Sequence, residues 1–439
     1  MQELKDLMRK YGIVGAGGAG FPSYAKLADG ANLLLINGSE CEPLLYTDYV
    51  LLKNEMDMVL AGVNQVLSHT SISEACIAIK AHNAEKLGWV DGQRLTEKVF
   101  VRALPDVYPI GDEISLIYEA TGRLVKPGKL PITQGIIVYN VETMYNLGRA
   151  VRFSEPVTQK WLTIGGDIKN PTVIKVPIGA KISHIFDRLN IVVKEGYTVI
   201  DGGPSMGKVI NPGTYAVNKT TKGILILPNS SQAIASKMVN EKMAIARAET
   251  ACCQCTRCTD MCPRHLLGYP LEPHKMVRTA MGAAEAIPQM VISATLCCGC
   301  GICESLACNQ GISPRAVIDN YKKLLSKNRL RFDIDGNYSA KPEREYRMVP
   351  YKKWMSMLGV GKFDKTAEFS GEINDFTRVE LSLSRHIGIP SIPAVKDGDM
   401  VNEGDLIANA ADGLSLPQHA SVSGRVTLGN DKIIIDKVR

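Results

Sequence analysis

The sequence of 439 residues has few of the features that mark membrane, secreted or nucleic-acid-binding proteins. It contains no apolar run of the ~18 residues that a membrane-spanning helix needs. The first residues, Met1–Lys5, lack the charged and apolar regions of a secretory leader. The net charge is only +6, and no stacking aromatics accompany the basic residues, which argues against a nucleic-acid surface. We therefore expect a cytoplasmic protein with no membrane span and no nucleic-acid partner.

The composition is otherwise that of an ordinary globular protein, with 45% hydrophobic residues. A chain of this length is long for one hydrophobic core, so several domains are expected. Cysteine is the exception, because ten of the 12 cysteines lie between Cys252 and Cys308. In a chain without a secretory leader, this density indicates metal or redox chemistry rather than disulfides.

Two motifs account for eight of these cysteines. The first motif, Cys252–Cys262, has the spacing of bacterial ferredoxins and is followed by Pro263. The second motif, Cys297–Cys308, has one extra residue before its last cysteine and is followed by Asn309 in place of proline. In ferredoxins the fourth cysteine of each motif ligates the other cluster. We therefore predict two [4Fe–4S] clusters with crossed ligands. One cluster is expected on Cys252, Cys255, Cys258 and Cys308, and the other on Cys262, Cys297, Cys300 and Cys303.

Zinc is the alternative metal, because CxxC pairs also form zinc sites. Such sites commonly use two separated pairs, whereas here three consecutive CxxC steps occur twice, which favours the clusters. Cys253 and Cys298 stand beside the predicted ligands and are expected to be neighbouring thiols rather than ligands. The spacer between the motifs is apolar and compatible with a helix over Met276–Ile292, which predicts an α-helical ferredoxin-type domain.

Near the start of the chain, glycine is concentrated between Gly12 and Gly20. Gly15, Gly17 and Gly20 match the GxGxxG string of dinucleotide-binding proteins, but a helix predicted over Glu3–Lys10 precedes the loop where a strand would be required. The match is therefore weak by itself. A backbone so rich in glycine can nevertheless approach a phosphate or a flat ring closely.

A buried strand is predicted over Asn32–Asn37, directly after the glycine loop. It ends in the acidic turn Gly38–Pro43, which carries Glu40 and Glu42. The carboxyl end of a strand is where α/β sheets bind ligands, although a solvated turn would explain the same residues.

Four segments, taken in order, carry a resemblance to a known family: Gly15–Phe21, Asn37–Pro43, Tyr108–Glu113 and Val138–Thr143. They resemble the flavin- and NADH-binding subunit of respiratory complex I and, more closely, the C subunit of the Rnf electron-transport complex. The resemblance implies a Rossmann-like domain with non-covalent FMN and with NADH as electron donor. The residues it assigns to cofactor binding are Gly15, Gly17, Gly18, Gly20, Phe21, Lys26, Asn37, Ser39, Glu40, Tyr108, Gly111, Asp112, Asn140 and Thr143. The residues it assigns to catalysis, facing the flavin or the nicotinamide, are Glu42 and Glu113.

Three positions depart from the complex I pattern. Ala16 replaces an arginine, Asp112 replaces a glutamate and Tyr139 replaces an amide residue. Since the arginine would face a phosphate, its loss predicts weaker binding of flavin or NADH than in that relative.

The remaining chain predicts further modules. The short strands between Trp161 and Gly207 resemble the β-grasp (SLBB) module that follows the flavin domain in both relatives. The C-terminal residues alternate apolar positions with glycine turns, which indicates a β-sandwich hybrid of the biotinyl/lipoyl type. Because Ala408–His419 contains no lysine, we expect a packing or docking role rather than a covalent carrier.

We therefore expect a multidomain α/β protein. Its predicted parts are an FMN/NADH-binding domain (1–155), an SLBB β-grasp domain (156–238), a two-[4Fe–4S] ferredoxin-type domain (239–322), a basic linker (323–375) and a barrel-sandwich hybrid domain (376–439). The positive charge of the linker is typical of a solvated segment or of a docking strip for an acidic partner.

The order of these modules points to one family. In the Rnf C subunit the sandwich module comes first, whereas here it comes last. This order is similar to that of the PduS-type cobalamin reductases of propanediol-utilising bacterial microcompartments. The resemblance implies cobalamin as substrate, an adenosyltransferase and a microcompartment shell or electron-transfer protein as partners, and a location within a microcompartment.

These parts predict one function and leave two alternatives. NADH gives up two electrons as hydride and a [4Fe–4S] cluster accepts one, so a flavin must stand between them. We predict an NADH-dependent reductase that brings cobalamin to its cob(I)alamin state. The first alternative is a peripheral electron-input subunit of an Rnf-like membrane complex. The second is a non-catalytic electron-relay scaffold, which would hold clusters without FMN.

Overall fold

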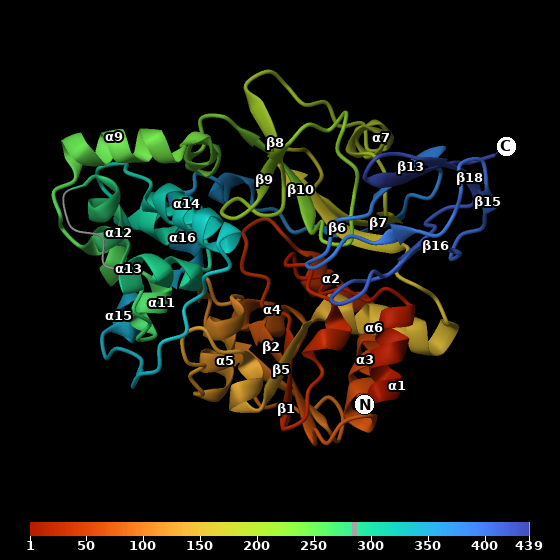
Figure 1. Ribbon diagram of the computed structural model, residues 1–439, viewed down its shortest axis with the longest axis horizontal. Helices are drawn as coiled ribbons and strands as arrows, with labels where there is room; N and C mark the ends of the chain where they lie inside the picture. The colour runs from red at the N-terminus through yellow and green to blue at the C-terminus, as the bar shows by residue number, and fades with distance from the viewer. Residues whose placement is uncertain (283–287, 439) are drawn as a thin grey trace.

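The computed structural model describes residues 1–282 and 288–438. Figure 1 shows the N-terminal module at the bottom of the view in red and orange, with a sheet-rich module above it in yellow-green. The cysteine-rich helices lie on the left in green and cyan, and the C-terminal strands lie on the right in blue. The N-terminal module and the cysteine-rich helices are therefore neighbours, and the C-terminal strands lie on the far side from the cysteines.

The N-terminal module is built on a parallel sheet with the strand order β3-β2-β1-β5. Its strands are β1 (Leu33–Asn37), β2 (Glu74–Lys80), β3 (Val99–Leu104) and β5 (Ile136–Asn140). Its helices are α1 (Gln2–Lys10), α2 (Thr47–Asn54), α3 (Met56–Ser68), α4 (Ala81–Lys86), α5 (Glu113–Thr121) and α6 (Val141–Phe153). The register places Asn37 directly beside Asn140, so the polar ends of two strands meet at one edge of the sheet.

Two glycines allow the helices that cover this sheet to pack closely. A Cβ at Gly62 of α3 would collide with the backbone of Met144 in α6, and a Cβ at Gly148 of α6 would collide with the backbone of Met58. Since only glycine permits this approach, the pair fixes α6, and with it the position of its N-terminus.

The second module is a mixed sheet with the strand order β12-β7-β6-β10-β8-β9. Its own elements are β6 (Gln159–Gly166), β7 (Thr172–Pro177), α7 (Ile182–Arg188), β8 (Tyr197–Asp201), β9 (Lys208–Ile210) and β10 (Gly223–Pro228). The edge strand β12 (Glu368–Glu372) comes from much later in the chain and pairs with β7 in parallel. A segment that follows the cysteines is thus part of this sheet.

The cysteine-rich module is helical, as predicted. It contains α9 (Glu241–Ala251), α10 (Arg257–Asp260), α11 (Pro263–Leu266), α12 (Pro273–Ala280), α13 (Pro288–Ile292) and α14 (Pro314–Lys327). The helix predicted over Met276–Ile292 is represented by the end of α12 and by α13, and residues 283–287 of that prediction lie outside the described residues.

The predicted basic linker 323–375 has secondary structure of its own. After the end of α14 it forms α15 (Arg344–Arg347), β11 (Val349–Pro350) and α16 (Tyr351–Met357). β11 pairs antiparallel with β4 (Val107–Tyr108) of the N-terminal module, and Trp354 of α16 is fully buried. The expectation of a solvated linker is therefore incomplete, because this part of the segment packs against the N-terminal module.

The C-terminal module consists of two small sheets, with the orders β13-β19-β18-β15 and β14-β16-β17. Its strands are β13 (Arg378–Ser382), β14 (Ile392–Pro393), β15 (Met400–Val401), β16 (Leu406–Asn409), β17 (Gln418–His419), β18 (Gly424–Leu428) and β19 (Lys432–Asp436). The amide of Glu380 donates to the carbonyl of Gly179 at 2.9 Å, and Val379 and Ile433 belong to the same hydrophobic core as Leu4 of α1. The module is packed onto the rest of the chain. Across all described residues, helices that combine the length and the apolar character of a bilayer span are absent.

Candidate functional site

Polar residues from three segments meet at the carboxyl edge of β1 and β5. The amide nitrogen of Asn37 donates to the carbonyl of Gly111 at 2.9 Å, and that of Asn140 donates to Asp48 Oδ2 at 2.9 Å and to the carbonyl of Asn37 at 3.3 Å. Asn140 Oδ1 accepts from the amide of Glu142 at 3.0 Å and so caps α6. Ser39 Oγ donates to a backbone carbonyl of β2 at 3.0 Å. The sheet edge is a rigid, hydrogen-bonded platform.

The glycine loop lies against this edge. The amide of Ala16 donates to Thr143 Oγ1 at 3.0 Å, which joins the loop to the first turn of α6. A Cβ at Gly17 would lie 3.4 Å from Asn140 Cβ, whereas the Cβ position of Gly18, with φ of +102°, has no atom of the described residues within 4 Å. The loop closes where the amide of Gly15 donates to the carbonyl of Phe21 at 2.8 Å. Open backbone at a helix N-terminus fits a phosphate or the flat ring of a flavin.

The predicted acidic residues after Tyr108 have different surroundings. Glu113 Oε1 accepts from Lys26 Nζ at 2.8 Å, and its side chain remains 39% exposed. Asp112 is held on both sides, because its Oδ2 accepts from the amide of Ser115 at 3.2 Å and its Oδ1 from Arg264 at 2.7 Å. Glu113 is therefore accessible to an incoming ligand, and Asp112 fixes the turn.

Glu42 is buried in a joint between modules. Its carboxylate accepts from the amides of Ser205 at 2.8 Å and Met206 at 3.2 Å, and from the hydroxyl of Tyr108 at 3.3 Å. Burial raises the pKa of Glu42, and these donors oppose the shift. The geometry ties the loop between β8 and β9 to the flavin module through Glu42.

Glu40 belongs to a buried charge cluster that sequence reasoning missed in part. Its Oε2 accepts from the amide of Asp48 at 3.2 Å, and Lys222 of the second module lies 2.5 Å from Asp48 Oδ1 and 4.0 Å from Glu40 Oε1. Burial, followed by the charge of Asp48, raises the pKa of Glu40 to about 8. Neither Asp48 nor Lys222 stands in a recognisable motif, so only the three-dimensional packing identifies them.

The first predicted cysteine set surrounds a cavity of about 140 Å³. Cys252, Cys255, Cys258 and Cys308 all line it. Burial, followed by the charges of Cys308, Cys255 and Cys252, raises the pKa of the Cys258 thiol to about 12. Among the described residues, no group of three histidine, cysteine or acidic side chains lies close enough to hold a single metal ion. The four thiols and the cavity suit a cluster that spaces them apart.

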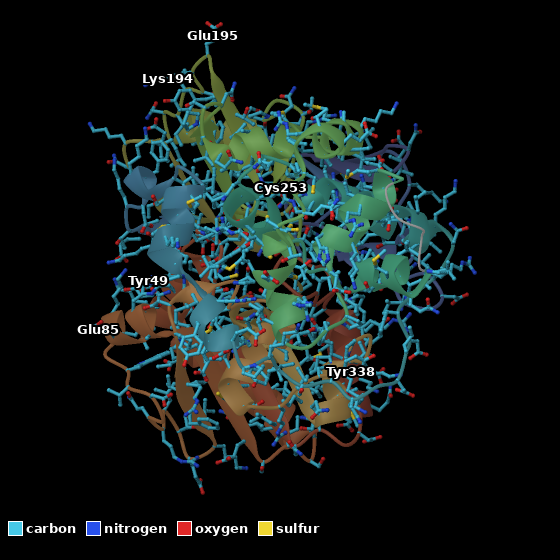
Figure 2. The ribbon with its side chains drawn as sticks, turned by 90° about the vertical axis from the view of Figure 1, so that its left-hand side faces the viewer. Tyr49, Glu85, Lys194, Glu195, Cys253 and Tyr338 are labelled. Atoms are coloured by element: carbon cyan, nitrogen blue, oxygen red, sulfur yellow. The ribbon has the colours of Figure 1, made fainter. Side chains whose placement is uncertain are left out.

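The second set is more deeply buried. Cys262, Cys300 and Cys303 are each 8% exposed. Burial, followed by Glu304, Cys297, Cys262 and Cys258, raises the pKa of the Cys303 thiol well above its ordinary value, so cysteines of both motifs lie near one another. The neighbouring thiol of Cys298 lies beside Cys300 and Arg264. Both crossed sets are thus brought together, and Figure 2 looks onto this module and labels Cys253.

Two contacts join the segment Tyr108–Glu113, called the flavin turn below, to the second cysteine set. Tyr108 donates its hydroxyl to the carbonyl of Cys300 at 2.7 Å, and Arg264 bonds to Asp112 as described above. Trp354 stacks on Tyr108 with ring centroids 4.6 Å apart and donates to Ser205 Oγ at 3.0 Å. Arg264 follows Cys262-Pro263 directly, which could have singled it out, whereas Trp354 lies in the predicted linker.

Three family models match separate parts of the chain. They describe the Nuo51 FMN-binding domain over residues 8–149, a 4Fe-4S dicluster domain over 251–313 and the RnfC barrel sandwich hybrid domain over 370–433. Over nearly the whole length, the chain is 36% identical to the cobalamin reductase PduS of Salmonella typhimurium strain LT2, covering 98% of this chain and 96% of the relative.

The chain belongs to the PduS family. A second member, from Citrobacter freundii, is also 36% identical, over 97% of this chain and 94% of its own. The C subunit of the proton-translocating ferredoxin:NAD(+) oxidoreductase complex of Clostridium ljungdahlii is 34% identical over 61% of this chain and 57% of its own. An NAD+-reducing [NiFe]-hydrogenase structure aligns with a TM-score of 0.46 at 18% identity, over 79% of this chain and 62% of that one, which is too low to support a conclusion.

The family matches confirm the fold class and the cofactor classes that the sequence predicted for this member of the PduS family. The flavin-domain match contains the glycine loop and the sheet edge, and the dicluster match contains all eight predicted ligands. The dicluster match therefore decides for iron–sulfur clusters and against zinc. The barrel sandwich match confirms the prediction for the C-terminal module. The protein is a flavin and iron–sulfur oxidoreductase.

Proposed function

We propose that this protein takes hydride from NADH and delivers single electrons to a corrinoid, reducing cobalamin to the cob(I)alamin state. The observation that carries the proposal is the hydrogen bond of 2.7 Å from Tyr108, in the flavin turn, to the carbonyl of Cys300 in the cluster loop. It supports a flavin that accepts two electrons directly beside a cluster that accepts one. The substrate follows from the name of the relatives that share nearly the whole chain.

The residues at the sheet edge would hold FMN, which supplies the conversion from two-electron to one-electron transfer. The glycine loop and the first turn of α6 present backbone amides to its phosphate or ring. Lys26 and Asn37 fix the adjoining turns through Glu113 and the carbonyl of Gly111. The crossed cysteine sets would ligate the two clusters.

Of the two acidic residues expected in catalysis, Glu113 keeps that role in the proposal. Its exposed carboxylate beside Lys26 is free to contact the bound nucleotide. Glu42 is better described as a positioning residue, because its oxygens accept from Ser205, Met206 and Tyr108. We further propose that the protein acts inside a microcompartment, with an adenosyltransferase that consumes the reduced corrinoid.

The test is NADH-driven formation of Co(I) under strict anaerobiosis. Protein reconstituted to about eight iron per chain, as two clusters require, is mixed with NADH, cob(II)alamin and an adenosyltransferase that traps Co(I). Trapped product that depends on NADH supports the proposal. Dye reduction without any trapped product contradicts it and favours the electron-input role of the Rnf-like relatives. Clusters without retained flavin would favour the relay scaffold.

Matched variants show whether the clusters carry these electrons. Cys258→Ala removes a ligand of the first set, whereas Cys76→Ala changes a buried cysteine in β2, outside both sets. We expect Cys258→Ala to slow Co(I) formation far more than dye reduction and Cys76→Ala to change neither. Unchanged Co(I) formation in Cys258→Ala would mean that the flavin reduces the corrinoid directly.

A further inference from the structure

The two cysteine sets differ in how they contact the flavin module. The second set is joined to it through Tyr108 and the carbonyl of Cys300, and through Asp112 and Arg264, two residues after Cys262. The side chains of Asp112 and Arg264 are only 13% and 10% exposed, so this ion pair is shielded from water. By contrast, the cavity of the first set is lined, within the described residues, by side chains from 252–314 and by none from the flavin module.

The two cysteine sets also differ in how deeply they are buried. Tyr108 is 2% exposed beneath Trp354, and three cysteines of the second set are buried. In the first set Cys255 is exposed, as is its neighbour Cys253, while Cys252, Cys258 and Cys308 are partly exposed. The second set therefore lies between the flavin module and the first set, and the first set faces outward.

The two sets also adjoin each other. Cys258 of the first set lies in α10, and Cys262 of the second set stands at the start of α11. One short segment therefore contributes to both sets. A continuous path thus runs from the flavin turn through the second set to the first.

We propose that electrons enter the ferredoxin-type domain at the cluster of Cys262, Cys297, Cys300 and Cys303 and leave from the cluster of Cys252, Cys255, Cys258 and Cys308. This order rests on the proposed flavin and cluster sites. Each NADH loses a hydride and becomes NAD+, which yields two electrons and one proton. The electrons pass singly to two molecules of a one-electron acceptor at the outer cluster, and the proton goes to water.

The test uses the full reconstituted chain and electron paramagnetic resonance of the reduced clusters. Cys258→Ser should lose the outer cluster, and NADH should still reduce the remaining one. Cys303→Ser should lose the inner cluster, and the remaining outer cluster should be reduced by dithionite but not by NADH. NADH reduction of the outer cluster in Cys303→Ser at the unaltered rate, or failure to reduce the inner cluster in Cys258→Ser, would overturn the order.

A second pair of variants keeps every cysteine, in case Cys303→Ser cannot hold its other cluster. Arg264→Met breaks the contact with Asp112 and should slow cluster reduction after rapid mixing by about tenfold, the scale of one lost buried charged contact. The control is Lys242→Met, which changes an exposed cation of α9 that does not line the cavity of the first set and should leave this rate unchanged. Slowing by Lys242→Met alone would contradict the proposed order.

Failure of the proposed function is distinguishable from failure of this order. None of these measurements contains a corrinoid, so a different final acceptor leaves them unaffected. If NADH does not reduce the flavin of the unaltered protein, the proposed function fails. The order is then tested by photoreducing the flavin and following the same two cluster signals in the same variants.

Discussion

At the scale of single residues, Gly17 is the position where a side chain most directly opposes flavin binding. Its Cβ position faces Asn140 at 3.4 Å on the exposed side of the loop. We expect Gly17→Val to abolish flavin retention, because a branched side chain would fill the space between the loop and the sheet edge. Flavin content of the purified protein, measured by absorbance after denaturation, checks this.

The matched control is Gly361→Val. The Cβ position of Gly361 lies 4.0 Å from the nearest atom, on Met355, and the residue belongs to the segment after α16 rather than to the glycine loop. This variant should retain flavin. Full flavin occupancy in Gly17→Val would show that the loop is only a turn.

Residue-scale reasoning from sequence found the end of β1 but not the contacts between modules. Asn37 and Asn140 could be predicted to meet, because parallel strands align their carboxyl ends. Lys222 reaches the flavin module from a distant part of the chain, so no local pattern marks it. Arg264 follows the motif Cys262-Pro263, but only the structure shows that it pairs with Asp112. Glu42 was assigned by resemblance, and only the structure shows that its carboxylate accepts from the loop after β8.

At the scale of elements, the segment β11–α16 gives part of the expected linker a regular structure. Its charged residues, Lys352 and Lys353, face outward, while Trp354 and Met355 are buried. Tyr351, Trp354, Met355 and Leu358 recur at i, i+3, i+4 and i+7, so the amphipathic helix itself could have been predicted from the sequence. The strand pairing of β11 with β4 depends on a partner more than 200 residues earlier, which sequence alone does not reveal.

Trp354→Ala should therefore destabilise the protein. Removing a fully buried tryptophan is expected to lower the free energy of unfolding by ~3–5 kcal/mol. Trp354→Phe keeps a ring on Tyr108 but loses the bond to Ser205, which is expected to cost ~1 kcal/mol. Denaturant unfolding of the loaded protein measures both. Equal stability of Trp354→Ala and the unaltered protein would contradict the packing role of α16.

At the scale of the whole molecule, Lys219 joins three modules and has no carboxylate partner within the described part of the chain. Its Nζ donates to the carbonyl of Gly12 at 2.9 Å and to that of Pro417 at 3.4 Å. Burial lowers its pKa to about 7, from 10.5 in the unfolded chain. Nearby His419, whose pKa burial lowers to about 3, stays neutral in the same range.

This shift predicts a pH-dependent stability. Between pH 7 and 10.5 the unfolded chain binds more protons at Lys219 than the folded chain, so its contribution to stability rises with pH across that window. Below pH 7 the contribution is constant. We expect the unaltered protein to gain stability relative to Lys219→Met as the pH rises from about 7 to about 9. Parallel stability profiles of the two proteins in denaturant titrations would contradict the prediction.

The contacts of the C-terminal module also bear on the order of modules along the chain. It packs against residues that directly follow α1, because the amide of Ile387 donates to the carbonyl of Gly20 at 2.8 Å and Tyr24 donates its hydroxyl to the carbonyl of Ser415 at 3.2 Å. A module in that position can be covalently joined before α1 or after β12 and still cover the same surface. An arrangement with the module first would then be a circular permutation of the arrangement here. The point at which the chain connects to this module can thus change in evolution while the surroundings of the glycine loop stay the same.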